Sequence, residues 1–313
     1  MAKKDLAYLK GRLSRIRYYL CEGLALRRSV KSVEMLLADV DVTSDLQNRV
    51  DYYCKLNQPF SPSAKAVSVA TFKKTKSFVY YADTKRVVRH FPKNKRFDYV
   101  FGDVTDVPDT PSFVKSRPIS EDNQNSVLLK LNAIRHYKFL SDSLEFENKR
   151  PLAVWRGMVY HQHRRDFVDM YWGSNLANIG HNDEKLSYEP SYKGFLSIQE
   201  QLNYRYIISV EGKDVATNLK WAMASNSLVM MRRPRFETWF MEGLLVPGVH
   251  YVELKEDFSD LEEKIEYYNL HTSEALEIIE CAHKHVSQFF DKDKEQLVSL
   301  LVAKKYFGLV EDN

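Results

Sequence analysis

The 313-residue sequence is poor in cysteine, with Cys21, Cys54 and Cys281 spread over the whole chain. An odd number of widely separated cysteines provides neither a disulfide framework nor the paired spacing of a structural zinc site. We therefore expect a protein of a reducing compartment whose stability depends on an apolar core. Hydrophobic residues make up 44% of the chain and aromatic residues 13%. This composition and length favour a folded protein of two domains.

Long apolar runs are also missing. No stretch approaches the ~20 apolar residues that a membrane-spanning helix needs. Residues 1–23 interleave cationic and apolar residues and lack the uninterrupted apolar segment of a signal peptide. The sequence therefore predicts a cytoplasmic protein.

Several motifs of nucleotide and hydrolase chemistry are absent. The sequence has no Gly-x-x-x-x-Gly-Lys-Ser/Thr loop, no Gly-x-Gly-x-x-Gly and no Gly-x-Ser-x-Gly. Asp-x-Asp pairs at 39–41 and 291–293 match a motif of metal-dependent nucleotide-sugar enzymes, but such short pairs are common by chance. The pair His161 and His163 lacks a third ligand at a suitable spacing. We predict no metal site and no cofactor.

Charge is unevenly distributed although the formal net charge is only +4. Residues 1–31 contain nine Lys or Arg against Asp5 and Glu22, and residues 73–96 contain nine more against Asp83 alone. Residues 253–280 reverse the balance with ten carboxylates against two lysines. The basic N-terminal third predicts an anionic partner or surface. No recognition helix or RNA-binding aromatic motif accompanies it, so a nucleic acid partner is not expected.

The apolar periodicity predicts an α/β protein divided near Pro151. Helices are expected over residues 5–38, 42–58, 125–139, 164–172, 197–204, 272–290 and 294–307, with others starting near 215 and, at a Ser-x-x-Glu capping box, near 259. Strands are expected over 78–82, 86–91, 97–101, 152–155, 206–210, 228–231 and 250–254, and a loop over 173–194. The basic helix at 5–38 suits either an anionic membrane surface or packing on its own domain with a solvated cationic face.

Polar side chains follow several of the predicted strands. They are Asp106, Arg156, Glu211, Arg232 and Glu237. Ligands of open α/β sheets bind beyond the carboxyl ends of the strands, and arginine forks suit phosphate groups. As a set, these residues predict a site for a phosphorylated ligand.

An ordered series of motifs between about residues 95 and 310 resembles glycosyltransferase family 90, and most closely its bacterial lipopolysaccharide-core branch. The series consists of FGDVTD at 101–106, VKSRPI at 114–119, WRG at 155–157 with RD at 165–166, YIISVEGKDVATNLK at 206–220, ETWF at 237–240 and HY at 250–251.

The resemblance implies a GT-B fold, in which two Rossmann-like domains face each other across a cleft. Residues 1–150 would bind the acceptor and residues 151–313 the donor, with C-terminal helices that can cross back to the first domain. It implies a metal-independent, inverting hexosyltransferase that uses a UDP-sugar. The acceptor would be the inner core of lipopolysaccharide or lipooligosaccharide, at the cytoplasmic face of an anionic inner membrane to which the protein binds peripherally.

The resemblance also assigns roles to residues. Asp106, in Val104-Thr105-Asp106-Val107-Pro108, matches the stretch that carries the catalytic base in eukaryotic relatives. The expected donor-binding residues are Arg156, Arg165, Glu211, Gly212, Asp214, Thr217, Asn218, Lys220, Arg232 and Glu237.

Two positions depart from the family pattern. Thr105 replaces an arginine beside the base, and Ala216-Thr217-Asn218 replaces a Ser-x-Arg that contacts the donor diphosphate. These departures leave a second hypothesis open, a non-catalytic degenerate transferase that binds a polyanion or a membrane surface.

Overall fold

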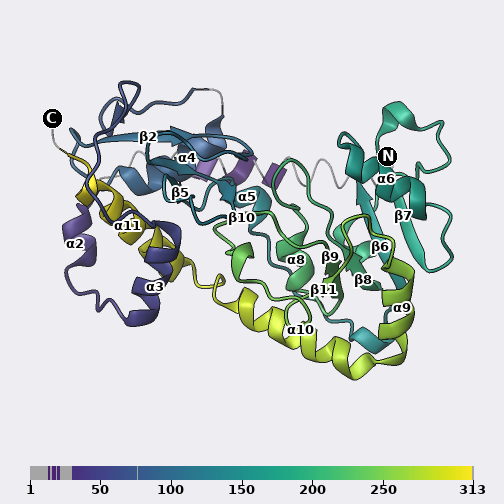
Figure 1. The fold of residues 1–313 in the computed structure, drawn as a ribbon. Helices are drawn as coiled ribbons and strands as arrows, with labels where there is room; N and C mark the ends of the chain where they lie inside the picture. The colour runs from purple at the N-terminus through teal and green to yellow at the C-terminus, as the bar shows by residue number, and fades with distance from the viewer. Residues whose placement is uncertain (1–12, 15, 19, 22–29, 76, 312–313) are drawn as a thin grey trace. The chain divides into compact units, whose positions relative to one another are not determined.

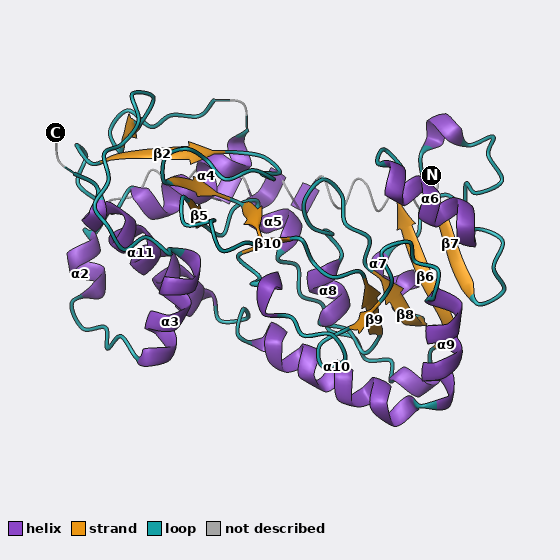
Figure 2. Cartoon of the chain, viewed as in Figure 1, coloured by secondary structure: helices purple, strands orange, loops and turns teal. Residues whose placement is uncertain are grey.

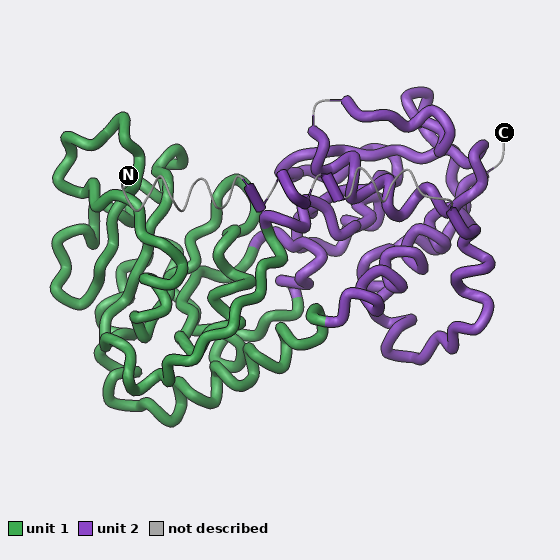
Figure 3. Tube along the Cα trace, turned by 180° about the vertical axis from the view of Figure 1, so that it is seen from behind, with its two compact units in different colours: residues 1–8, 136–234, 244–290 green, residues 9–135, 235–243, 291–313 purple. Residues whose placement is uncertain are grey.

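The computed structural model describes residues 13–14, 16–18, 20–21, 30–75 and 77–311 (Figure 1). The chain divides into two compact units (Figure 3). Unit 1 contains His136–Pro234 and Leu244–Phe290, and unit 2 contains the described residues up to Arg135 together with Arg235–Gly243 and the chain from Asp291 onward. The sequence places the domain boundary at residue 150, and the first division between the units in the described chain lies after Arg135. The last helix belongs to unit 2, with the N-terminal segment.

Unit 1 is built on a five-stranded parallel sheet with the order β11-β9-β8-β6-β7 (Figure 2). Its strands are β6 (Arg150–Gly157), β7 (Ala177–His181), β8 (Tyr204–Ile208), β9 (Leu228–Met231) and β11 (Val252–Glu253). Its helices are α6 (Gln162–Tyr171), α7 (Ile198–Gln201), α8 (Leu219–Met223), α9 (Leu261–Leu270) and α10 (Thr272–Ser287), with 3₁₀ turns η1 (Phe146–Asn148) and η2 (Glu184–Leu186).

One face of this sheet forms the main core of unit 1. Alternate residues of the strands, including Trp155, Tyr206 and Met230, are buried against α6, α9 and α10. Helix α10 contributes Ala275, Ile278 and Ile279 to this core. Its buried Ala282 and Val286 continue the same 3–4 spacing on that side of the helix. The alternating apolar residues of the strands therefore pack against the apolar sides of the helices in one layer.

Unit 2 contains a second sheet with the order β1-β2-β3-β5, in which β2, β3 and β5 are parallel. Its strands are β1 (Val67–Ser68), β2 (Arg96–Val100), β3 (Ser112–Val114) and β5 (Ser126–Leu128), and a separate antiparallel pair joins β4 (Ser116–Pro118) to β10 (Phe236–Thr238). Its helices are α2 (Val33–Leu37), α3 (Ser44–Tyr53), α4 (Phe78–Val88) and α11 (Lys292–Leu309); α5 (Ala133–His136) and η3 (Glu242–Leu244) lie at the unit boundaries.

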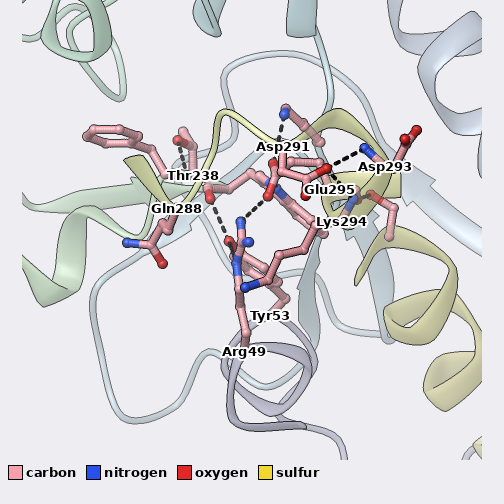
Figure 4. A network of polar contacts seen from close by, with 12 residues as sticks. Arg49, Tyr53, Thr238, Gln288, Asp291, Asp293, Lys294 and Glu295 are labelled. Atoms are coloured by element: carbon pink, nitrogen blue, oxygen red, sulfur yellow. Dashed lines mark hydrogen bonds and ion pairs between the residues drawn. The ribbon is translucent and has the colours of Figure 1, made fainter. Parts of the chain in front are cut away.

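Residues 235–243 leave unit 1 after β9 and are anchored in unit 2 by Trp239. The Trp239 ring stacks on Tyr53 with centroids 3.8 Å apart, and its Nε1 donates to Glu295 at 2.7 Å. Glu295 also pairs with Arg49 (Figure 4). A second ion pair joins Glu295 to Lys130 at 2.7 Å. This network ties together four segments of unit 2 that are distant in sequence: α3, the residue Lys130 after β5, residues 235–243 and α11.

The start of α11 lies beside this network. The Asp291 side chain accepts hydrogen bonds from the backbone N–H groups of Asp293 and Lys294, at 2.9 Å each (Figure 4). The Asp-x-Asp pair at 291–293 is thus the N-cap of a helix.

The prediction of a mixed α/β fold with parallel strands is confirmed. The predicted strands at 78–82 and 86–91 are wrong, because this segment forms α4. Its β-branched and aromatic residues resemble strands, but Tyr80, Thr84, Val87 and Val88 recur at helical spacing and are buried. Tertiary packing outweighs the local strand propensity here.

Three further expectations are also wrong. The helix expected over 125–139 is replaced by the buried parallel strand β5 and the single turn α5, because a short apolar run fits either structure. The loop expected over 173–194 contains the edge strand β7. The capping box expected at Ser259 does not form: α9 begins at Leu261, and its N-cap Asp260 makes no side-chain cap bond.

The helix expected over 5–38 lies largely outside the described residues. The described residues between 13 and 21 are helical, and α2 follows separately. Within the described part of the chain, no helix is both long enough and apolar enough to cross a membrane.

The Glu295 network allows a test of what holds residues 235–243 in unit 2. We expect Glu295→Gln to lower the free energy of unfolding by about 3–5 kcal/mol, because it removes the negative charge that faces the buried Arg49 and the partly buried Lys130. Urea unfolding measures the loss. The control Glu280→Gln removes one partner of the exposed pair with Lys284 and should change stability by less than about 0.5 kcal/mol. Equal stability of Glu295→Gln and the unaltered protein would contradict this role.

Candidate functional site

The carboxyl edge of the unit 1 sheet collects most of the predicted donor-binding residues. In the sheet, β6 lies between β7 and β8. The chain passes from β6 to β7 on one side and then returns to β8 on the other, so the strand order reverses between β6 and β8. The loops after β6 and β8 leave in different directions at such a point, and ligands of open α/β sheets bind there. The site is therefore expected around the ends of β6 and β8.

Arg164 and His163 of α6 hold the loop that follows β8. The Arg164 guanidinium donates to the carbonyls of Val210 and Glu211 at 2.8 Å each, and His163 Nε2 lies 2.8 Å from the Glu211 carbonyl. Burial lowers the pKa of His163. Gly212 continues the loop directly beside Arg164, whose Nη2 lies 3.5 Å from the position of a Cβ there. The side chains of α6 thus hold the loop after β8 in place.

Glu211 and Arg232 form an ion pair at the ends of β8 and β9. Arg232 also donates to the Glu256 carbonyl at 3.0 Å, and its guanidinium lies over the Phe258 ring, 4.8 Å from the centroid. The structure therefore brings these two predicted residues together, but the charge of each is balanced by the other.

The loop and helix after β8 carry four more predicted residues. Asn218 folds back onto the strand, where its Nδ2 donates to the Ile208 carbonyl at 2.9 Å. Thr217 is partly buried beside it, whereas Asp214 and Lys220 are buried, the latter completely. Lys220 therefore lies inside unit 1, away from solvent.

Arg165 points to a different partner. Its guanidinium pairs with Glu189, whose Oε2 also lies 3.2 Å from Nε2 of the buried His181. The predicted donor-binding charge of Arg165 is therefore neutralised within unit 1.

Arg156 differs from the other predicted cations. Its guanidinium donates to the carbonyls of Trp155 and Asn178 and, at 2.6 Å, to Asn178 Oδ1. These partners are all neutral, and no carboxylate pairs with Arg156 among the residues that the structure describes. Burial lowers the pKa of the Arg156 guanidinium to about 10. At neutral pH it is a half-buried positive charge that an anion would stabilise.

Unit 2 carries the predicted base. Asp106 is exposed on the loop between β2 and β3, the carboxyl side of its parallel sheet, and accepts a hydrogen bond from the Thr105 hydroxyl at 3.3 Å. The loop is anchored by Ser116, which bonds both backbone groups of Val104 at 3.0 Å, and by the Lys115–Asp103 ion pair. A carboxylate on an anchored loop and open to solvent can accept a proton.

Glu237 also lies in unit 2 and not with the other predicted donor residues. Its carboxylate pairs with Arg117 at 2.7 Å and accepts a hydrogen bond from the Tyr52 hydroxyl. Arg117 is fully buried and also donates to the carbonyls of Tyr52 and Ser126. These contacts give Glu237 a structural role in joining β10 to β4.

Comparison with known sequences decides the family. The profile of Glycosyl transferase family 90 matches residues 126–307, more than half of the chain. A protein named O-glucosyltransferase LpsA, from Dichelobacter nodosus, is 46% identical over 274 residues, which cover 88% of this chain and 86% of that protein. The chain belongs to glycosyltransferase family 90. It is therefore a transferase enzyme, as the resemblance predicted, and a purely binding protein is not supported.

Two other relatives are less similar. Protein O-glucosyltransferase 2 of Danio rerio is 30% identical over 141 residues, 42% of this chain and 28% of that protein. The O-glucosyltransferase rumi homolog of Aedes aegypti is 25% identical over 161 residues, 48% of this chain and 39% of that protein.

The family 90 profile spans all of the strands of unit 1 but begins after Asp106. The base assignment and the donor-binding roles therefore stay predictions. Metal independence also stays a prediction, although no group of three or more His, Cys, Asp or Glu able to hold a metal ion occurs among the described residues.

Sequence reasoning missed Arg164 and His163, which position the family 90 loop after β8. Both side chains bind main-chain carbonyls of Val210 or Glu211. Every residue has such a carbonyl, so the sequence does not indicate which one a side chain will bind. The one available signal was their place at the start of a helix that follows the Trp-Arg-Gly motif at 155–157.

Proposed function

We propose that this family 90 enzyme transfers glucose, with inversion, from UDP-glucose to the inner core of lipopolysaccharide or lipooligosaccharide, without a metal ion. The observation that carries the proposal is Arg156, a half-buried guanidinium at the end of β6 whose hydrogen-bond partners within the described chain are all neutral. A diphosphate is the natural counter-charge for such a group. The names of the three relatives above, all O-glucosyltransferases, support glucose as the hexose.

The reaction needs a base and a stabilised leaving group. The Asp106 carboxylate takes the proton of the acceptor hydroxyl while that oxygen attacks the anomeric carbon from the face opposite UDP. The bond between the anomeric carbon and the diphosphate oxygen breaks, and UDP leaves with the electron pair. Arg156 stabilises the negative charge that develops on the diphosphate.

A GT-B arrangement would let the two units share this work, with the donor on unit 1 and Asp106 of unit 2 directed at the sugar. Each unit supports this division by itself, because each contains a parallel sheet with a candidate residue beyond the carboxyl ends of its strands. We propose this arrangement for the catalytic state.

The test of the proposal is Asp106→Asn. Asparagine keeps the size of the side chain but cannot accept the proton, so transfer of glucose to purified core oligosaccharide should fall by about 10²–10⁴-fold. The affinity for UDP should stay within about twofold of the unaltered enzyme. Transfer is measured by mass spectrometry and UDP affinity by isothermal titration.

The matched control is Asp109→Asn, which changes another exposed aspartate of the same loop and should leave turnover nearly unchanged. Turnover retained by Asp106→Asn would reject the base assignment. The unaltered enzyme is also assayed in excess EDTA, where transfer should persist. Loss of transfer that manganese restores would overturn the metal-independent part of the proposal.

We further propose that the enzyme works while bound to the anionic cytoplasmic face of the inner membrane, where its acceptor is made. In the described part of the N-terminal helix, Leu13, Ile16 and Leu20 are exposed at 62, 45 and 64% and share one helix face. Tyr18, on the other side, bonds to Asp83 and Arg86 of α4. The helix thus packs on unit 2 and still offers an apolar face beside Arg17, which suits an anionic lipid surface.

The membrane contact predicts a dependence on lipid charge. The double variant Leu13→Asp/Leu20→Asp should lose most of its co-sedimentation with vesicles containing anionic phospholipid, while Leu270→Asp, at an exposed leucine of unit 1, should not. Binding that is equally strong to neutral vesicles, or unaffected by the double variant, would contradict the proposal.

A further inference from the structure

Lys193 lies beside the Arg156 site, although no sequence motif singled it out. The segment 191–193 runs along the edge of β7, where the His181 N–H donates to the Ser191 carbonyl and the Lys193 N–H donates to the His181 carbonyl, both at 3.0 Å. These bonds fix the backbone of Lys193 against the end of the sheet.

Gly180 makes room for the Lys193 side chain. A Cβ on Gly180 would lie 2.7 Å from Lys193 Cγ and 2.7 Å from the Ser191 carbonyl oxygen, closer than real contacts allow. Gly180 is the register partner of Arg156 on the neighbouring strand. Residues paired in this way present their side chains to the same face of a sheet, so the lysine stem occupies the space next to the Arg156 side chain.

Two positive charges therefore meet on this face. Lys193 is exposed, and within the described chain neither it nor Arg156 forms an ion pair with a carboxylate. Burial and the neighbouring Arg156 charge both lower the pKa of the Lys193 ammonium. Repulsion between two cations is unfavourable unless an anion lies between them, and the exposure of Lys193 leaves such an anion a route from solvent.

We propose that Lys193 is a second cation of an anion site centred on Arg156, and that the site binds a phosphate group. A phosphate carries enough charge and enough acceptor oxygens to satisfy both side chains. The phosphate belongs either to the diphosphate of the donor or to a phosphorylated sugar of the acceptor. The choice of these two sources rests on the proposed function, whereas the binding of a phosphate group by Arg156 and Lys193 does not.

Pyrophosphate tests the site directly. Isothermal titration of the full-length protein should give an affinity for pyrophosphate that falls about tenfold in Lys193→Gln and at least as much in Arg156→Gln, since each variant removes one charged partner. The control Lys185→Gln, an exposed lysine between β7 and Lys193, should bind pyrophosphate like the unaltered protein. The melting temperature of Lys193→Gln should be unchanged, because the ammonium forms no ion pair with any residue that the structure describes.

Two further arms identify the source of the phosphate. If it is the donor, Lys193→Gln weakens UDP binding about tenfold and leaves uridine binding unchanged. If it is the acceptor, UDP affinity is unchanged and KM rises for phosphorylated core oligosaccharide but not for the dephosphorylated form. Pyrophosphate affinity that is unaffected by Lys193→Gln, or undetectable in the unaltered protein, would overturn the inference. Pyrophosphate binding without glucosyl transfer would count against the proposed function alone.

Discussion

One half-buried positive charge, that of Arg156, pairs with no carboxylate among the described residues, and the proposed anion site of this enzyme depends on it. The Arg156 guanidinium is held in place by the carbonyls of Trp155 and Asn178 and by the Asn178 side chain, which orient it without neutralising it. Removing a charge from water is unfavourable unless another charge compensates for it. An arginine held in this way at the strand-order reversal of a parallel sheet is therefore better explained by an anionic ligand than by stability.

Three other arginines show what a structural role looks like. Arg49 pairs with Glu295, Arg117 with Glu237, and Arg232 with Glu211, and each pair joins segments that are distant in sequence. The Glu237-Thr-Trp-Phe motif belongs to this class, because Glu237 and Trp239 both fasten residues 235–243 within unit 2. These paired charges hold each unit together, whereas we propose that Arg156, which pairs with no carboxylate among the described residues, binds an anion.

The sequence predicts an element of the fold well when the pattern that identifies the element lies within the element itself. Strands β8 and β9 are recognisable because each is a short, buried run of apolar residues, and α10 because its apolar residues repeat at helical spacing. Helix α4 resembles a strand locally, and only its packing in unit 2 decides the matter. Glu237 follows β9 closely in sequence, which suggested a place in the donor site, but the chain crosses into unit 2 between them. Arg164 could not be assigned at all, because its partners are main-chain carbonyls.

The most direct measurement of the central claim is amide hydrogen exchange with and without UDP-glucose. We expect slower exchange at the ends of β6 and β8, in residues 156–158 and 209–213, with no change at the C-terminal end of α9, where Asn269 donates to the Pro151 carbonyl near the start of β6. The Arg156→Gln variant should lose this protection at the same ligand concentration. Protection confined to unit 2, or protection at the two strand ends that persists fully in Arg156→Gln, would contradict the assignment of the donor site.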